Sequence, residues 1–312
     1  MPINFIKSLF PLIIIFFSYY SVWAEEPDLI FYPETVQGGT VQFLFTGGGA
    51  EDMVISLQNS KGSEISSTKG FEWTSADGKT FDTALLGIPP SVAPGDYIVY
   101  ATGRSSGAYW KLVKKLNVRE KDFDHYTMVL SDKMNAIYSD NSKQKKEEAQ
   151  KLWSVLLSFN KNDMFFTESF ENPVRNGVTT SPYGQQRTFL MPEGAERKSI
   201  HFGSDLWAPE GTPVHAAGRG KVVLAEKRII TGNTVVLEHL PGVYTLYYHL
   251  DSINVKTGEI ADIDNVIGTL GKSGFATGEH LHWEMRVNGV PVDPMYFLEH
   301  PLLDISLLIS NM

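Results

Sequence analysis

Short runs in which hydrophobic and polar residues alternate dominate the chain between residues 25 and 118. Three of these runs lie at residues 41–45, 53–57 and 97–100, and they are separated by turn signals at residues 47–49, 77–78 and 94–96. A period of two residues is typical of half-buried β-strands. Several short strands over about 95 residues indicate an immunoglobulin-like β-sandwich. We therefore predict a β-sandwich accessory domain over residues 25–118.

The pattern changes between residues 119 and 168. A stretch rich in lysine and glutamate at residues 143–148 precedes apolar residues spaced by three and four positions, namely Leu152, Trp153, Val155, Leu156 and Phe159. This spacing predicts an amphipathic helix with one face packed on a domain. We interpret residues 119–168 as a helical connector and the charged stretch as its solvated face.

Strand signals return from residue 169 onward, together with unusually frequent glycine. Strands interrupted by glycine turns favour a compact antiparallel sheet over a helical fold. The chain is therefore expected to be mainly β, with a C-terminal antiparallel β domain over residues 169–300 and a C-terminal tail over residues 301–312.

Residues 1–24 form a distinct segment. Lys7 precedes an apolar run at residues 9–20, and Val22 and Ala24 provide the small residues of a cleavage site. The run is about half the roughly 20 residues that a spanning helix needs, and Pro11 interrupts it. We therefore expect a cleaved signal peptide rather than a retained membrane anchor. The mature protein would be exported to the periplasm or the extracellular side of the envelope, with no integral membrane anchor.

The charge and cysteine content exclude several classes of function. The formal net charge is −9, so a basic surface for nucleic acid is not expected. The chain has no cysteine, which excludes disulfides, a thiol nucleophile and a thiolate metal site. Any metal must therefore be held by histidine and carboxylate side chains.

Six of the eight histidines lie between residues 201 and 282, and His280 and His282 are the most informative. They belong to a run in which Leu281 and Trp283 alternate with them, so both imidazoles should project from the polar face of one strand. Asn288 and Gly289 then predict a hairpin turn.

Two further pieces complete a candidate metal site. His201 and Asp205 are four residues apart, a spacing that places both on one side of a strand or helix. His249 follows two tyrosines, and alternation places Thr245 and Tyr247 on its face, where they would line a groove. Two histidines and one aspartate suit a catalytic zinc ion, which usually takes three protein ligands and one water molecule. Two histidines would remain to handle protons.

The order of these pieces resembles the lysostaphin-type (LytM-like) zinc endopeptidases, which cut peptidoglycan cross-bridges. The resemblance extends over roughly residues 172–298 and includes supporting segments at residues 180–184, 208–214, 271–274 and 277–284. It implies an antiparallel catalytic domain of the lysostaphin (duplicated hybrid motif) type. It also implies one Zn²⁺ ion held by His201, Asp205 and His282, and catalytic roles for His249 and His280.

Other polar residues receive plainer interpretations. Glu284 shares the polar face of its strand with His282, so it either supports that histidine or is an ordinary hydrogen-bonded strand glutamate. Arg187 would line the cleft or lie on the surface. His239 is expected to be structural, and the remaining histidines to be surface or packing residues, namely His125, His215 and His300.

The expected function is a zinc-dependent endopeptidase that hydrolyses the stem-peptide cross-links of peptidoglycan, with a zinc-activated water molecule and two catalytic histidines. One alternative is a catalytically silent protein that binds the wall or activates an amidase. Another is a zinc endopeptidase that acts on secreted proteins. The predicted sandwich would bind the wall, act as a spacer or cover the groove within the same molecule, and the sequence leaves these three roles open.

Overall fold

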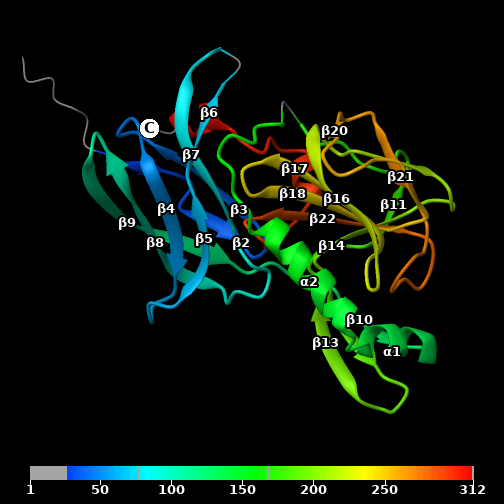
Figure 1. Ribbon diagram of the computed structural model, residues 1–312. Helices are drawn as coiled ribbons and strands as arrows, with labels where there is room; N and C mark the ends of the chain where they lie inside the picture. Colours follow the sequence, from blue (N-terminus) through cyan, green and yellow to red (C-terminus); the bar gives the residue numbers. More distant parts are fainter. Residues whose placement is uncertain (1–26, 76, 167–168, 311–312) are drawn as a thin grey trace, which may run out of the picture.

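The computed structural model describes residues 27–310 except residues 76 and 167–168 (Figure 1). The predicted signal peptide at residues 1–24 lies outside the described residues. Strands β1 to β23 greatly outnumber the helices among the described residues, so the prediction of a mainly β protein is confirmed. Within the described ranges, no helix is both long and apolar enough to cross a membrane.

Two sheets form the N-terminal half and enclose one hydrophobic core. The first sheet contains, in spatial order, β1 (Leu29–Ile30), β3 (Thr40–Phe45), β7 (Thr80–Gly87) and β6 (Phe71–Thr74). The second contains β2 (Glu34–Val36), β9 (Ala108–Arg119), β8 (Gly95–Ser105), β4 (Glu51–Gln58) and β5 (Glu64–Lys69). Alternate residues of these strands point inward, among them Phe43, Ile55 and Val99, which are fully buried. The immunoglobulin-like type of this sandwich stays a prediction.

A strand and two helices follow, namely β10 (His125–Val129), α1 (Asp132–Ser139) and α2 (Lys143–Leu156). Helix α2 is amphipathic, as the spacing of its apolar residues predicted, and Leu156 packs on the outer face of the C-terminal sheet. Strand β10 was not foreseen in the predicted connector. Its five residues pair in parallel with β12 (Gln186–Leu190), a partner about 60 residues further along the chain that local patterns do not reveal.

A long antiparallel sheet forms the framework of the C-terminal half. Its spatial order is β11 (Val178–Ser181), β14 (Gly203–Trp207), β22 (Leu281–Val287), β18 (Val243–Leu250), β17 (Gly232–Leu240), β16 (Gly220–Arg228) and β20 (Ile260–Ala261), and β23 (Val290–Val292) also pairs with β22. Strand β13 (Glu196–Ile200) joins β10 and β12 in a small sheet. Another small sheet contains β15 (Pro213–His215), β21 (Val266–Thr269) and β19 (Ser252–Ile253).

Strand β22 alternates as its sequence predicted. Leu281, Trp283 and Met285 are fully buried in the core. His282 and Glu284 belong to the opposite face. Asn288 and Gly289 have φ angles of +50° and +78°, which is the left-handed pair that a two-residue hairpin turn requires. The predicted hairpin between β22 and β23 is therefore confirmed.

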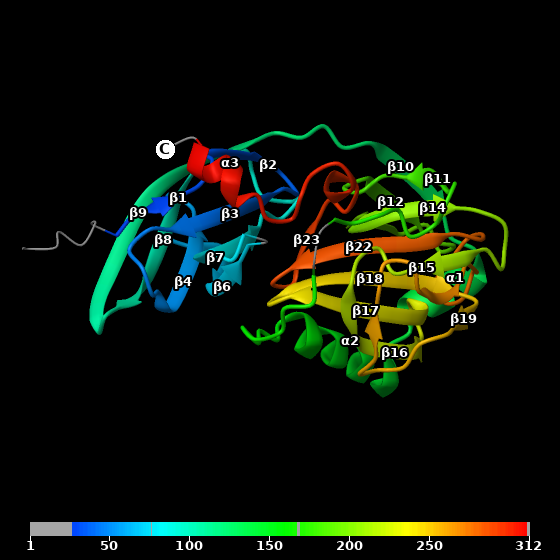
Figure 2. The same cartoon turned by 90° about the horizontal axis from the view of Figure 1, so that it is seen from above.

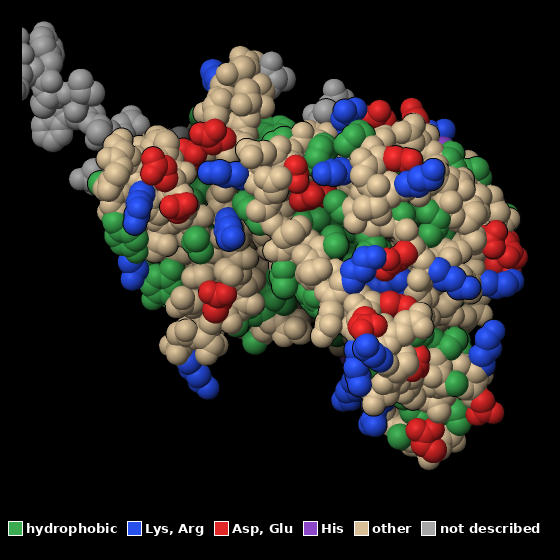
Figure 3. Space-filling view, viewed as in Figure 1, with side chains coloured by type: hydrophobic (Ala, Val, Ile, Leu, Met, Phe, Trp, Pro, Cys, Tyr) green, Lys and Arg blue, Asp and Glu red, His purple; other side chains and the backbone are tan. Residues whose placement is uncertain are grey.

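The two halves pack directly against each other along β7, β22 and β23 (Figure 2). Phe71 and Leu85 of the first sheet belong to the core of the C-terminal half. Lys121 and Asp293 form an ion pair of 2.7 Å across the junction. Positively and negatively charged side chains are interspersed over both halves of the face shown in Figure 3.

The end of the chain returns to the N-terminal sandwich. After the 3-10 helix η1 (Met295–Leu298), helix α3 (Ile305–Ser310) packs Ile305 and Leu308 against Leu44 of β3. Residues 301–310, which were predicted to be a tail, therefore contribute to the first sheet's outer face.

Candidate metal centre

The candidate centre is built where β14 and β22 lie side by side. The two strands are antiparallel, and Asp205 pairs in register with His282. His201 lies between β13 and β14, two residues before β14 begins, and its side chain reaches the same spot. Gly203 allows this close approach, because a Cβ atom there would lie 2.9 Å from both His282 Nε2 and Glu284 Cγ.

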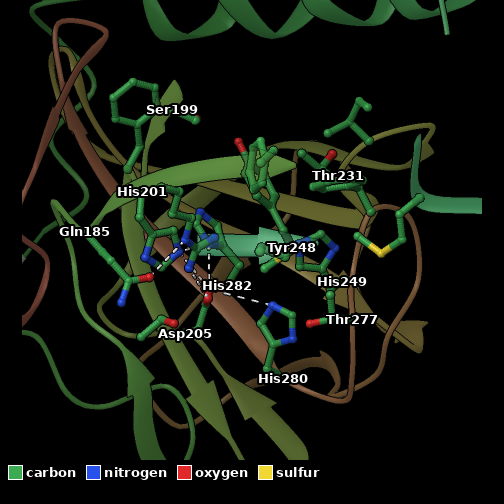
Figure 4. A pocket seen from close by; sticks show the side chains of 18 of the residues that line it. Gln185, Ser199, His201, Asp205, Thr231, Tyr248, His249, Thr277, His280 and His282 are labelled. Carbon is green, nitrogen blue, oxygen red and sulfur yellow. Dashed lines mark hydrogen bonds and ion pairs between the residues drawn. The ribbon is translucent and has the colours of Figure 1, made fainter. Parts of the chain in front are cut away.

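Three ligand atoms converge at this spot (Figure 4). His201 Nε2 lies 2.9 Å from Asp205 Oδ1 and 2.8 Å from His282 Nδ1. His282 Nδ1 in turn lies 2.8 Å from the same carboxylate oxygen. All three residues are buried, and among the described residues they form the group of histidine and acidic side chains able to hold a metal ion. Two nitrogens and one oxygen are a suitable donor set for Zn²⁺.

The outward-facing nitrogen of each imidazole has an acceptor. His201 Nδ1 faces the carbonyl oxygen of Pro182 at 2.9 Å, and a carbonyl can only accept. His282 Nε2 lies 3.0 Å from the carboxylate of Glu284. Burial lowers the pKa of His282, but the hydrogen bonds to Asp205 and Glu284 outweigh this effect and raise the pKa to about 9, so without a metal this ring is protonated. A metal ion would displace the protons on the converging nitrogens, whereas the nitrogens that face Pro182 and Glu284 would keep theirs.

Glu284 is a buried and ionised partner of His282. Burial by itself raises the pKa of Glu284, but the charge of Arg286 and the hydrogen bond from His282 outweigh this effect and lower the pKa to about 2. Arg286 contacts its carboxylate at 2.5 Å. The geometry therefore favours the interpretation in which Glu284 orients His282 over that of an ordinary strand glutamate.

Arg187 lies in the cleft rather than on the surface. Its guanidinium donates to Asp205 Oδ2 over 2.8 Å, so Asp205 is tied on one oxygen to Arg187 and faces the two imidazoles with the other. Burial alone raises the pKa of Asp205, but hydrogen bonds from His201 and His282 hold it well below the usual range. The carboxylate is therefore ionised.

His249 and His280 face the same cleft from the other side of the cluster (Figure 4). Their ring centroids are 5.0 Å apart, and His280 Nε2 lies 3.7 Å from Asp205 Oδ1. His249 Nδ1 donates to the carbonyl oxygen of Ser273 over 2.8 Å, and His280 Nδ1 donates to that of Gly278 over 2.9 Å. Burial lowers the pKa of both rings, that of His249 to about 3. Both rings are thus neutral and each has a free Nε2.

The prediction that Thr245 and Tyr247 line the groove is wrong. The pairing of β17 with β18 shifts register beyond Tyr247, and the backbone at His249 has a φ of +63°. This extra residue interrupts the alternation, so His249 does not continue the face of Thr245 and Tyr247. Those two side chains lie in the core, where their hydroxyl groups are hydrogen-bonded to each other over 3.0 Å.

Tyr248 takes their place in the cleft wall. Its ring stacks on that of His282, with centroids 5.4 Å apart and planes inclined by 6°. Sequence reasoning missed this residue because a strict period of two assigned it to the opposite face. The alternation contains no signal for the bulge.

The cleft above the cluster has a volume of about 850 Å³. Its lining residues lie between Tyr126 and Glu284, and no described residue of the N-terminal sandwich lines it. Cover of the groove by that sandwich stays a prediction.

The remaining histidines lie outside the cluster, as predicted. His239 is fully buried, bonded to Thr245 over 2.7 Å, and burial lowers its pKa to about 4. His215 bonds a backbone carbonyl, His300 stacks on Tyr296, and His125 is exposed on β10.

A buried set of two imidazoles and one carboxylate lies in an open cleft beside two neutral histidines, and this set could hold a metal ion. Residues 199–294 match the family model for Peptidase family M23. This match agrees with the sequence resemblance to the lysostaphin-type (LytM-like) peptidases.

Two relatives show the level of similarity. The chain is 42% identical over 116 residues to the DD-carboxypeptidase/endopeptidase Mpg of Neisseria meningitidis, covering 37% of this chain and 26% of that protein. It is 45% identical over 94 residues to the peptidoglycan DD-endopeptidase ShyC of Vibrio cholerae, covering 30% of this chain and 22% of that protein. The matches thus span only about a quarter of these relatives.

A solved structure from Pseudomonas aeruginosa, described as a peptidase M23, has a similar fold over most of the chain. The TM-score is 0.58 at 22% identity, with 84% of this chain and 94% of that chain covered. At this level of identity the likeness establishes the fold alone.

Proposed function

We propose that the chain is an exported zinc endopeptidase that hydrolyses the peptide cross-links of bacterial peptidoglycan. The observation that carries this proposal is the convergence of His201, Asp205 and His282 on one point at the base of the cleft. The match to Peptidase family M23 supports a peptidase activity. The names of the relatives from Neisseria and Vibrio support peptidoglycan as the substrate class and the cell envelope as the place of action.

His201 Nε2, His282 Nδ1 and Asp205 Oδ1 would hold the zinc ion, because these atoms converge on one point and zinc binds this donor set once it displaces the imidazole protons. When bound, zinc would supply a Lewis acid that polarises the scissile carbonyl group and lowers the pKa of a water molecule to about 7. Arg187 and Glu284 would keep the carboxylate and one imidazole in place.

His249 and His280 would handle protons. Each ring is neutral, is oriented by a backbone carbonyl that accepts from Nδ1, and presents an unprotonated Nε2 to the cleft. One ring can accept the proton of the attacking water molecule and pass it to the leaving amine. The other can donate to the oxygen of the tetrahedral intermediate once it is protonated.

Mass spectrometry of the fragments released from purified peptidoglycan tests this proposal. We expect the protein to release fragments with a newly free amine at a cross-link, release to stop with a chelator, and zinc to restore it. Parallel incubation with a panel of unfolded secreted proteins distinguishes a wall-directed enzyme from a general protease. Cleavage of the panel without cleavage of the wall, or identical release by an Asp205→Ala variant, would overturn the proposal.

A further inference from the structure

One wall of the cleft is built by residues 122–142, a segment that lies outside the matched family region at residues 199–294. We call this segment, which contains β10 and α1, the arch. We propose that the arch determines substrate specificity by receiving an apolar side chain next to the cleaved bond of the peptide. This inference rests on the proposed peptidase function and names the part of the molecule that would select its substrate.

Strand β10 extends one face of the small sheet along the cleft. Its parallel register pairs Tyr126 with Arg187 and Met128 with Phe189. Paired residues of adjacent strands point to the same face, and all four side chains line the cleft. Arg187 at one end of this face contacts Asp205, so the face begins at the candidate metal centre and extends to Phe189.

Helix α1 adds an apolar ridge beside this face. Met134 and Tyr138 are four residues apart and therefore lie on one side of the helix, and both line the cleft. The Tyr138 ring packs on Phe189, with centroids 5.5 Å apart, and on Phe275, at 5.7 Å. Phe275 follows Ser273, whose carbonyl oxygen orients His249. The apolar ridge thus adjoins the loop that orients His249.

Several hydrogen bonds hold the arch in this position. Lys145 of α2 donates to the Tyr138 carbonyl oxygen over 2.6 Å at the end of α1. Glu148, one turn further along α2, accepts from the backbone of Ile229 over 2.8 Å. Residues 230 and 231 next to this contact also line the cleft. The arch is therefore connected through α2 to the same loop region as the candidate site.

The arch residues in the cleft wall should disfavour a charged substrate side chain. The arch residues that line the cleft are Tyr126, Met128, Met134 and Tyr138, and none carries a charge. A charged substrate side chain placed against these four residues would lose water without gaining a charged partner from the arch, which is costly. Lys145 of α2, which also lines the cleft, already donates to the carbonyl oxygens of Ile137 and Tyr138. Methionine and tyrosine offer adaptable apolar contact, so aliphatic side chains of different sizes should be accepted.

The test uses the full-length protein and synthetic peptides that contain a peptidoglycan peptide cross-link, whether or not the digest releases fragments. One residue flanking the cleaved bond is varied among alanine, leucine, glutamate and lysine. We expect kcat/KM to be at least tenfold higher for alanine and leucine than for glutamate. In Met134→Lys this preference should fall at least tenfold, chiefly through KM, because the arch contacts the substrate and not the reacting atoms.

Two control variants separate recognition from structure. Tyr138→Phe keeps the apolar ring and should retain the preference, whereas Tyr138→Ala should raise KM for the apolar peptides. Tyr109→Ala removes a tyrosine that is 68% exposed on β9 and should change neither quantity. Zinc content and the thermal midpoint of each variant show that the centre and the fold are intact.

Equilibrium binding of the same peptides distinguishes failure of this inference from failure of the proposed function. If the wild-type protein hydrolyses none of the peptides but binds the apolar ones more tightly, the arch inference stands and the peptidase proposal fails. If it hydrolyses them with the same preference in the wild type and in Met134→Lys, the arch inference is overturned.

Discussion

Each of the four histidines around the candidate centre is oriented by a hydrogen bond from one of its ring nitrogens. Pro182, Ser273 and Gly278 provide carbonyl acceptors, and Glu284 provides a carboxylate. These contacts decide which nitrogen faces the cluster or the cleft, and they divide the four rings into two pairs. His201 Nε2 and His282 Nδ1 lie less than 3 Å from Asp205 Oδ1, whereas His280 Nε2 lies 3.7 Å away.

This division predicts different effects for the two pairs. His249→Ala and His280→Ala should retain zinc but lose at least a hundredfold in kcat, because proton transfer by a positioned side chain contributes about 10²–10⁴-fold. Zinc is measured by elemental analysis of the purified variants, and kcat with the peptide substrate defined above. His215→Ala, which alters a histidine outside the cluster, is the matched control. Wild-type turnover by either cleft variant would refute the assignment.

A second prediction concerns Glu238, a buried residue of β17 that accepts from the Tyr244 hydroxyl group over 3.1 Å. Burial, with a smaller contribution from the charge of Asp163, raises the pKa of Glu238 from 4.5 to about 7. The folded state therefore binds this proton more tightly than the unfolded state. The stabilisation from protonation is fully present below pH 4.5 and is lost as the pH rises through 7.

Glu238→Gln should remove this dependence, because glutamine is neutral and keeps an acceptor for Tyr244. The thermal midpoint of the variant minus that of the wild type should therefore become larger as the pH rises from 5 to 8. Thermal unfolding in a series of buffers measures the difference. A difference that stays constant over this range would show that Glu238 does not titrate in the folded protein as described.

At the scale of the elements, local sequence patterns predicted where strands lie better than they predicted which strands pair with each other. The alternation around His282 predicted β22 and its buried face, and Asn288 with Gly289 predicted the hairpin. The bulge at His249 and the parallel pairing of β10 depend on partners distant in sequence, so periodicity could not reveal them. The metal cluster itself depends on the register of Asp205 with His282, which the motif resemblance implied and spacing alone did not.

The hairpin offers a stability prediction. Gly289 has a φ of +78°, so Gly289→Ala should destabilise the protein by about 1–2 kcal/mol. The new methyl group would also come within 3.2 Å of Leu157 and Trp153 of the α2 region. Urea unfolding measures the change. Gly278→Ala is the matched control because a Cβ there meets nothing within 4 Å, and equal stability of the two variants would contradict the turn geometry.

At the scale of the whole molecule, the two halves share a hydrophobic core, but the described residues of the N-terminal sandwich do not line the cleft. Leu85 and Phe71 of the sandwich pack into the C-terminal core, and α3 returns to the sandwich. The lining of the cleft comes instead from the C-terminal half and from the arch. The segment between the two halves, which sequence patterns described as a helical connector, thus supplies a wall of the candidate site.

The most direct test of the central claim is the zinc stoichiometry of purified protein, measured by elemental analysis after equilibration with excess zinc and removal of unbound metal. We predict one zinc ion per wild-type chain, and near-complete loss in each of the single variants His201→Ala, Asp205→Ala and His282→Ala. Retention of one zinc ion by any of these three variants at the wild-type affinity would contradict the account.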